Sequence, residues 1–488
     1  MSGHPYIQPQ KIKIIIAGAG ISGLMTAIQL ERAGMEYVVF EKAKECLPLG
    51  SALSLTPACS YIFDQLGQVF IPFHLFSLAL MLEDVLKVSL PCQKISYVRD
   101  DLSPVGGMDA GNQTERYGYT GLLITRPSFY DVLLSRVPPH RVNWGKRILS
   151  FEQNQYGVMV RIADGSTFHG DILIGADGAY SAVRQVLYKN MMKKGLTVPK
   201  TDMAPLRFDS HCVIGVTDVL SPEEYPVLAT RSGDFQVIIG KERSLQVYLF
   251  PFAENRIGWQ ICGKMENPEE HDQQNFRFSD WGPVAADELC DQVRHYKCPF
   301  GGTLGDLMNR TSKERLSKVM LEEKYFQTWW HMRTVLVGDA CHKHLPFGGQ
   351  GANQAILDSV HLVNQLYAIP TASLDDVAKS FKAFYASRST NARDVYKSVG
   401  LVSTVLSSRG FGSELMRNIA LSKTPKWLSD LGMDGMNTDR PVLCFLPAPD
   451  VEAAVKARPQ AVPVHYKNLL KSKGLQVKSS SILSASSV

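Results

Sequence analysis

One short glycine-rich segment near the start of the chain constrains the fold more than any other feature. Residues 18–23 read Gly-Ala-Gly-Ile-Ser-Gly and lie between the apolar run Ile12 to Ala17 and the helical stretch Leu24 to Arg32. In that setting the first glycine allows a tight turn, the second lets backbone N–H groups approach a pyrophosphate, and the third permits close packing of helix on strand: Gly18, Gly20 and Gly23. The segment predicts a Rossmann-type α/β domain that binds a dinucleotide.

An acidic residue closes the next strand of the same unit. Glu41 directly follows the apolar run Tyr37 to Phe40, at the separation typical of a carboxylate that binds a ribose diol. Such a carboxylate repels a 2′-phosphate, so NADP is not expected at this position. Its presence also weakens the alternative that the glycine-rich turn binds nothing.

Two later segments suit the same long ligand. The apolar run Asp171 to Gly175 leads into Ala176-Asp177-Gly178, and Thr334 to Val337 leads into Gly338-Asp339-Ala340. Residues 349–353 then begin a helix, whose free N–H groups can stabilise negative charge on a reduced flavin. Taken together, these segments favour FAD as the dinucleotide.

With these ordered motifs the chain resembles the FAD-dependent aromatic hydroxylases, single-component monooxygenases of the para-hydroxybenzoate hydroxylase type, over roughly Ile12 to Arg393. It is most similar to the members that act in fungal secondary metabolism. The resemblance implies a Rossmann-type FAD-binding domain, an inserted antiparallel-sheet substrate domain and a C-terminal helical segment. It also implies NAD(P)H as a transient co-substrate and O2 as oxidant, and no recognised flavin-linking motif is present, so FAD is expected to be noncovalent.

The resemblance assigns cofactor contacts residue by residue. Asp339 matches an aspartate that contacts ribityl or ribose hydroxyls, with a helix N-cap as the alternative, and Arg126 matches an arginine near the flavin side chain and phosphates, with a surface salt bridge as the alternative. Asp177 matches a residue that faces the dinucleotide and the nicotinamide path, and Ser54 lies in the loop near the isoalloxazine, where many fungal relatives have glycine. The complete expected set is Gly18, Gly20, Gly23, Glu41, Ser54, Arg126, Asp177, Asp339, Gly351 and Ala352.

One histidine is a candidate catalytic residue on the substrate side. The stretch Phe208 to Gly215 resembles a strand that carries Tyr-Arg-Cys in fungal relatives and faces their substrate, and here Ser210 and His211 replace the tyrosine and arginine. His211 could supply a proton near neutral pH, and an ordinary histidine on a sheet surface is the alternative. Three further aromatic residues are expected on strands, in a pocket wall or in the core: Tyr248, Phe250 and Trp259.

Composition excludes several other classes of protein and site. The chain has 488 residues, 45% hydrophobic content and a formal charge of +5, without a basic cluster, so a nucleic-acid partner is not expected. Its nine cysteines include no CxxC pair, which favours a reducing compartment. The histidines show no metal-ligand spacing, so no metal is expected. His342 and Pro346 are interpreted as residues that shape the loop after Asp339, with catalysis as the alternative, and Cys341 as a small buried residue.

The sequence favours a cytoplasmic protein. Residues 1–10 lack the apolar region of a signal peptide, and no stretch approaches the roughly 18 apolar residues of a spanning helix. The most hydrophobic stretch, Val69 to Leu82, contains Pro72 and His74 and is interpreted as buried structure or pocket wall. Weak membrane-surface contact there is the alternative.

The motifs and the change in pattern between them predict the domain boundaries. We expect the FAD-binding domain at 8–190 and 327–395, the substrate domain at 191–326, a C-terminal helical and loop segment at 396–462 and a disordered tail at 463–488. Within the first range, Gly106 to Gly111 suggests a mobile loop.

These features predict an FAD-dependent monooxygenase that hydroxylates or epoxidises an apolar or aromatic small molecule. Two alternatives stay open: an FAD-dependent reductase or dehydrogenase of the geranylgeranyl-reductase-like type, and a flavin-binding protein without turnover. Both would share the same cofactor motifs, and oxygen consumption separates them from a monooxygenase.

Overall fold

The first strand, helix and strand of the chain form as their sequence pattern predicts. β1 (Lys13–Ala17) is buried from its second residue onward, α1 (Ile21–Arg32) follows it, and β2 (Glu36–Phe40) lies parallel to β1. A parallel strand covered on both faces reads as a continuous apolar run, and this explains the Ile-Ile-Ile sequence of β1. The computed structural model describes residues 10–45, 52–67, 81–240, 245–264, 283–407, 421 and 424–472.

One sheet brings the three glycine-bearing segments together. Its order is β18 (Trp330–His331), β19 (Thr334–Leu336), β12 (Ile172–Gly175), β1, β2 and β8 (Val142–Asn143), with only β18 antiparallel to its neighbour. The strands β19, β12 and β1 precede the three segments and are adjacent and parallel. The three turns therefore leave the sheet at the same edge, where ligands of open α/β sheets bind.

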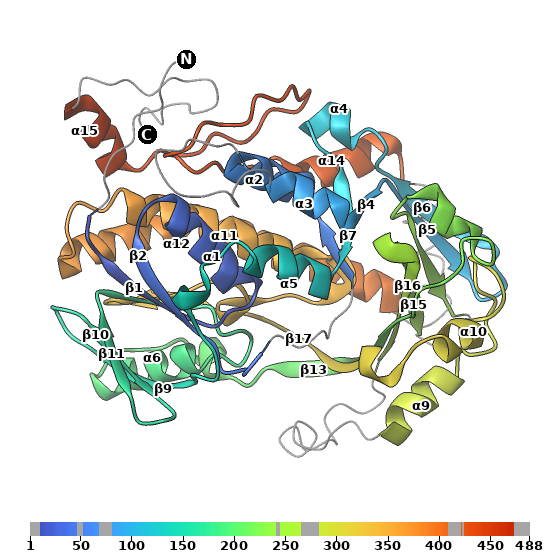
Figure 1. Cartoon of the computed structure of the whole chain (residues 1–488), viewed down its shortest axis with the longest axis horizontal. Helices are drawn as coiled ribbons and strands as arrows, with labels where there is room; N and C mark the ends of the chain where they lie inside the picture. The colour runs from blue at the N-terminus through green and yellow to red at the C-terminus, as the bar shows by residue number, and fades with distance from the viewer. Residues whose placement is uncertain are drawn as a thin grey trace.

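A larger sheet forms the opposite half of the molecule (Figure 1). Its order is β20 (His342–Lys343), β17 (Leu316–Tyr325), β13 (Arg207–Val216), β16 (Arg256–Lys264), β15 (Gln246–Phe252), β14 (Phe235–Ile239), β5 (Lys94–Arg99) and β6 (Pro104–Asp109). All neighbours are antiparallel except β14 and β5. The predicted fold class, a Rossmann-type domain with an inserted antiparallel sheet and a C-terminal helical segment, is confirmed.

The stretch that suggested a mobile loop instead forms part of this sheet. β5 and β6 pair as a hairpin, and β6 contains the first residues of the glycine-rich segment. A Cβ on Gly107 would lie 2.7 Å from the carbonyl oxygen of Ile95, so close strand pairing explains this glycine. Residues 94–109 thus belong to the substrate sheet although they lie within the range expected for the FAD-binding domain.

Helices cover both halves of the molecule. α11 (Gln350–Tyr367) and α12 (Leu374–Ser407) pack against each other, and α11 also packs against α1 (Figure 1). The other α-helices of the described residues are α2 (Pro57–Gly67), α3 (Met81–Lys87), α4 (Gln113–Tyr117), α5 (Arg126–Leu134), α6 (Ala182–Lys193), α7 (Lys200–Met203), α9 (Pro283–Asp291), α10 (Leu304–Asn309), α14 (Lys426–Asn437) and α15 (Val464–Ser472). Two small sheets are also present: one contains β3 (Ala52–Leu55), β7 (Gly121–Thr125) and β4 (Ser89–Cys92), and the other contains β11 (Thr167–Gly170), β10 (Val158–Ile162) and β9 (Ile148–Gln153).

The C-terminal segment packs against the FAD-binding half. Gln65 on α2 donates to the carbonyl of Leu443 at 3.0 Å, and Asn364 on α11 donates to that of Val442 at 2.7 Å. α15 occupies residues 464–472 of the predicted tail, and residues 473–488 lie outside the described part of the chain. Tyr466 and Leu470, one helical turn apart, are buried, and this packing explains the helix.

Two other sequence interpretations fall largely outside the structure. Residues 46–51 and 68–80, which include the loop before Ser54 and most of the hydrophobic stretch Val69 to Leu82, are not among the described residues. Within the described ranges, no helix combines the length and the apolar character that crossing a bilayer requires.

Candidate functional site

The three glycine-bearing turns pack closely against each other. Gly18 has φ +99°, and a Cβ there would lie 2.5 Å from the carbonyl oxygen of Ala176 in the second turn. A Cβ on Gly338 in the third turn would lie 3.0 Å from Oγ of Ser22 in the first. Side chains at these glycines would push the turns apart, which is the physical reason for their sequence.

The N-terminus of α1 is open to a ligand. Gly20 caps this helix without a side-chain hydrogen bond, and no atom lies within 4 Å of the position that its Cβ would take. The first N–H groups of the helix and its positive dipole end are therefore available for an anion. This arrangement fits the pyrophosphate of a dinucleotide.

Glu41 is fixed against the first turn. Its Oε2 accepts a hydrogen bond from the N–H of Ala19 at 2.8 Å, and its Oε1 accepts one from the N–H of Ala43 at 2.8 Å. Each carboxylate oxygen keeps a lone pair for a further donor. The geometry fits the expected contact with ribose hydroxyls.

Asp339 presents a charged carboxylate beside these turns. Burial alone would raise the pKa of Asp339, but the ammonium group of Lys343, 2.8 Å away, outweighs it and lowers the pKa below its usual value. Asp339 does not act as the N-cap of α11, because Gly349 takes that position. An ionised carboxylate that is one-third exposed can accept hydrogen bonds from ligand hydroxyls.

The N-terminus of α11 lies beside Ser54. Gly349 caps the helix with φ +60° and no side-chain hydrogen bond, and no atom lies within 4 Å of a Cβ on Gly351. Asn353 joins the two segments, since its Nδ2 donates to the carbonyls of Ser54 at 2.8 Å and Gly349 at 2.7 Å. The structure thus brings together Ser54, Gly351 and Ala352, and it adds Asn353 as a residue that the sequence interpretation did not assign.

Arg126 and Asp177 differ in how their side chains are used. Arg126 is exposed at the first turn of α5, and its guanidinium makes no hydrogen bond or ion pair with any residue that the structure describes. The salt bridge considered as its alternative is thus not seen in this part of the chain.

Asp177 instead accepts hydrogen bonds from the hydroxyl of Ser181 at 2.5 Å and the N–H of Val183 at 3.1 Å, at the start of α6. Its role toward a cofactor stays a prediction.

The structure does not bring His211 to this site. On β13, Cys212 and Ile214 share a sheet face with Tyr248, Phe347 and Val399, whereas Val213 packs on the other face against α9 and α10. A Cβ on Gly263, the cross-strand partner of His211, would lie 3.0 Å from His211 Nε2 and 3.4 Å from Leu289 of α9. Burial lowers the pKa of His211 to about 4, so the ring is uncharged near neutral pH. Its position and charge do not favour the proton-donor role.

The three aromatic residues considered for a pocket divide between the two faces. Tyr248 and Phe250 lie on the face that meets residues 338–349, called here the Asp339 segment. The ring of Phe347 in this segment is 6.3 Å from that of Tyr248. Trp259 lies on the opposite face, and its Nε1 donates to the hydroxyl of Thr311 at 3.0 Å. Trp259 is therefore a core residue.

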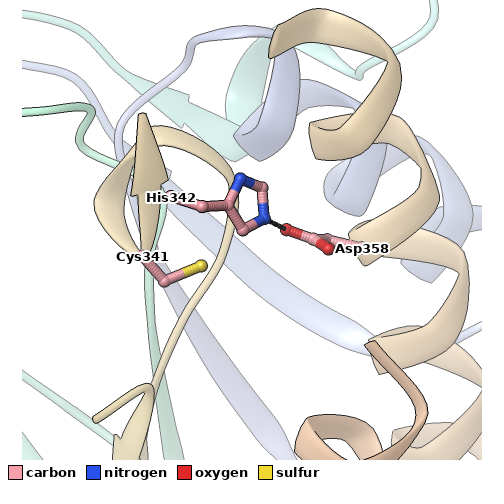
Figure 2. A group of neighbouring side chains, drawn as sticks. All are labelled: Cys341, His342 and Asp358. Carbon is pink, nitrogen blue, oxygen red and sulfur yellow. Dashed lines mark hydrogen bonds and ion pairs between the residues drawn. The ribbon is translucent and has the colours of Figure 1, made fainter. Parts of the chain in front are cut away.

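A buried group of potential metal ligands lies under the Asp339 turn. Figure 2 shows the ring of His342 directed at the carboxylate of Asp358, with the sulfur of Cys341 nearby. His342 and Arg388 keep the pKa of Asp358 below its usual value despite the opposing effect of burial, and both Asp358 oxygens have protein donors. Burial raises the pKa of the Cys341 thiol well above its usual range. The geometry favours a hydrogen-bonded group that supports the Asp339 turn. The absence of a metal stays a prediction.

Comparisons with known proteins agree with this geometry. A family model described as "FAD binding domain" matches residues 11–70 and 300–380, which include the first glycine turn and the Asp339 turn. The chain is 24% identical over 449 residues to the FAD-dependent monooxygenase atmM of Aspergillus flavus, covering 90% of this chain and 88% of that protein. It is 29% identical over 412 residues to the FAD-dependent monooxygenase cle3 of Aspergillus versicolor, covering 81% and 77%.

The chain contains an FAD-binding domain and resembles the FAD-dependent monooxygenases. Its fold is similar to that of Klebsiella pneumoniae HpxO, solved in complex with FAD and uric acid, with a TM-score of 0.69, 21% identity and coverage of 91% of this chain and 99% of that one. This monooxygenase uses FAD as its cofactor, and the open helix N-termini, the packed glycine turns and the two acceptor carboxylates described above fit that molecule.

Proposed function

We propose that this monooxygenase uses NAD(P)H and O2 to hydroxylate or epoxidise an apolar or aromatic small molecule in secondary-metabolite biosynthesis. The observation that carries the proposal is the aromatic sheet face that meets the Asp339 segment at Phe347. Fungal relatives named as FAD-dependent monooxygenases support it. A cytoplasmic location is part of the proposal, because the described cysteines are all free, as in a reducing compartment.

The sheet face has the composition of a site for an apolar ring system. The rings of Tyr248 and Phe250 stack with centroids 6.2 Å apart, and Phe235 lies 5.1 Å from Phe250. Few polar groups interrupt the face: the Tyr248 hydroxyl donates to Gln246 at 2.8 Å, and Gln260 donates to the Cys262 sulfur at 3.1 Å. A mostly apolar wall with a small number of placed polar groups is typical of small-molecule sites.

The roles of the chain follow from these positions. When bound, FAD supplies electron transfer from NAD(P)H to O2 and delivery of one oxygen atom to the substrate. Glu41, Arg126 and Asp339 bind and orient it, and the N–H groups at the start of α11 stabilise negative charge at its pyrimidine end. The aromatic face orients the substrate and excludes water.

Product analysis under isotopically labelled oxygen gas tests the proposal. With NAD(P)H and a panel of terpenoid, indole and phenolic compounds, we expect one labelled oxygen atom in the product and O2 consumption that depends on the substrate. A reductase would oxidise NAD(P)H and form product without label or O2 uptake, and a flavin-binding protein without turnover would oxidise no NAD(P)H; either result contradicts the proposal.

A pair of variants tests the aromatic face. Phe250→Ala should reduce product formation while FAD stays bound, because Phe250 lies on the face toward the Asp339 segment. Phe300→Ala is the matched control, since Phe300 has the same 8% exposure but packs on the opposite face. Equal losses of product formation in both variants would show that the Phe250 effect is one of stability only.

FAD should be released intact when the protein is denatured. The cofactor contacts assigned above are hydrogen bonds and charge interactions, and none of them places a nucleophilic histidine or cysteine as a flavin link. Heat or acid treatment should therefore leave yellow FAD in the supernatant. Flavin absorbance that stays with the precipitate would contradict the noncovalent assignment.

His211→Phe distinguishes a proton donor from a sheet residue. Since His211 lies on the α9 face and is uncharged, we expect unchanged product formation per NAD(P)H oxidised, measured together with peroxide release. A lost general acid would instead lower coupled product formation by about 100-fold or more. That outcome, with bound FAD retained, would establish the donor role of His211.

A further inference from the structure

A buried charge network lies directly beneath the Asp339 turn. Its centre is formed by His342 on β20, Asp358 on α11 and Arg388 on α12, whose side chains are 0% exposed. Asp439, in the C-terminal segment after α14, extends the network and is 14% exposed. Of these residues, only His342 was assigned a role from the sequence, as a residue that shapes the loop after Asp339.

One end of the network holds the cofactor turn. Asp358 Oδ2 accepts a hydrogen bond from the N–H of Gly338 at 2.9 Å and lies 2.7 Å from His342 Nε2. Gly338 directly precedes Asp339, and His342 follows three residues later, so a single carboxylate holds a backbone N–H on one side of Asp339 and a side chain on the other.

The other end of the network is anchored by Arg388. Its Nε donates to Asp358 Oδ1 at 2.9 Å, one terminal nitrogen donates to Asp439 Oδ2 at 3.0 Å, and the other donates to Gln354 Oε1 at 2.7 Å. A guanidinium has a rigid, planar set of donors, so these contacts fix the position of Asp358 as well as its charge. A lysine carries its three donors on a single nitrogen and lacks this planar arrangement.

The turn has little freedom to relax on its own. Gly338 has φ +61°, and a Cβ there would lie 3.0 Å from Ser22 in the first glycine turn and 3.2 Å from Ala355 on α11. If Asp358 moved or lost its partners, the Gly338 N–H would lose its acceptor in a buried place, which is costly. The least costly response is a change in the turn itself, which carries Asp339.

We propose that Asp358 and Arg388 are positioning residues for FAD, which hold the Gly338–Asp339 turn in its FAD-binding conformation, and that Asp439 extends this support to the C-terminal segment. The segment after α14 thereby becomes part of the cofactor site, although it lies outside the residues matched by the FAD-binding family model. This inference concerns cofactor binding and does not depend on the proposed substrate.

FAD affinity of the apo-protein, measured by flavin fluorescence, is the first test. Arg388→Met should raise the FAD dissociation constant by about 30-fold or more, and Asp439→Asn by about 3-fold to 10-fold, since the second change leaves the Asp358–Arg388 pair intact. Asp434→Asn is the matched control. Asp434, on α14, also pairs with an arginine at 2.8 Å, but this arginine is Arg116 on α4 and does not belong to the network beneath the Asp339 turn. Equal effects of Asp439→Asn and Asp434→Asn would contradict the role of Asp439.

A double-mutant cycle with Asp339→Ala separates positioning from general stability. If Arg388 acts through the turn, Arg388→Met should weaken FAD binding strongly in the parent and by about 3-fold or less in the Asp339→Ala protein, because the contact that it positions is already absent. Additive effects would overturn the proposal. Should Arg388→Met fail to fold, Arg388→Lys takes its place in the same cycle with the same criteria, since it keeps the charge but not all three contacts.

Discussion

Gly23→Ala should destabilise the apo-protein by about 3 kcal/mol or more, at or beyond the upper end of ordinary overpacking costs. A Cβ on Gly23 would lie 1.9 Å from the carbonyl oxygen of Gly18, and this atom is backbone in a turn that already touches the second motif. The clash cannot be relieved by rotating a side chain. Chemical denaturation of the FAD-free protein, followed by circular dichroism, measures the loss.

Gly20→Ala is the matched control. It should change the stability of the apo-protein little and lower its FAD affinity strongly. The space around a Cβ on Gly20 is empty, and its φ of −73° suits any residue, so apo-protein stability should fall by about 1 kcal/mol or less. The added methyl group would stand where the pyrophosphate approaches α1, so FAD affinity should fall by about 10-fold or more. Parent-like FAD binding by Gly20→Ala would contradict a pyrophosphate at this helix.

The cofactor half of the fold could be predicted because its signals are local. The turn at residues 18–23, the run before Asp177 and the run before Asp339 each contain a strand and its glycine in a few consecutive residues. Adjacent parallel strands then bring the three turns to one edge without further information from the sequence. The resemblance to FAD-dependent monooxygenases, the prediction of an enzyme and FAD as its cofactor were confirmed.

The position of His211 could not be obtained in this way. Alternation along β13 divides its residues between two faces, but only the packing of α9 against one face and Phe347 against the other decides which set meets the cofactor half. The same uncertainty applied to Trp259, which lies on the α9 face. The alternation along a strand shows which residues share a face of the sheet. Tertiary contacts decide which of the two faces meets the cofactor half.

Long-range pairing explains the other differences. β5 joins the substrate sheet by parallel pairing with β14, more than a hundred residues later in the chain, so its short sequence carried no signal of its partner. Asp358 and Arg388 looked like polar positions on two helices, and their burial follows from the packing of α11 against α12. One clue was available: Asp358 directly follows the apolar residues Ile356 and Leu357, where a buried charge needs a partner.

Asp339→Ala should raise the dissociation constant of FAD by about 10-fold to 150-fold, which corresponds to the loss of a charge-assisted contact of about 1.5 to 3 kcal/mol. The carboxylate is ionised beside Lys343 and one-third exposed, so it keeps lone pairs that can accept hydrogen bonds from a ligand. Asp339→Asn keeps an acceptor and should lose less. Arg126→Ala should show a loss in the same range, because its guanidinium has no other partner among the described residues.

Asp375→Ala provides the control for this last prediction. Asp375 forms the same kind of pair with a lysine four residues later, Lys379, at an exposed position on α12, so its loss should leave FAD affinity unchanged. Fluorescence titration of the four apo-proteins compares them directly. If Asp339→Ala binds FAD as tightly as Asp375→Ala does, the carboxylate serves only its local pair with Lys343, and the ribose or ribityl hydroxyls of FAD must find their acceptors elsewhere on the turn.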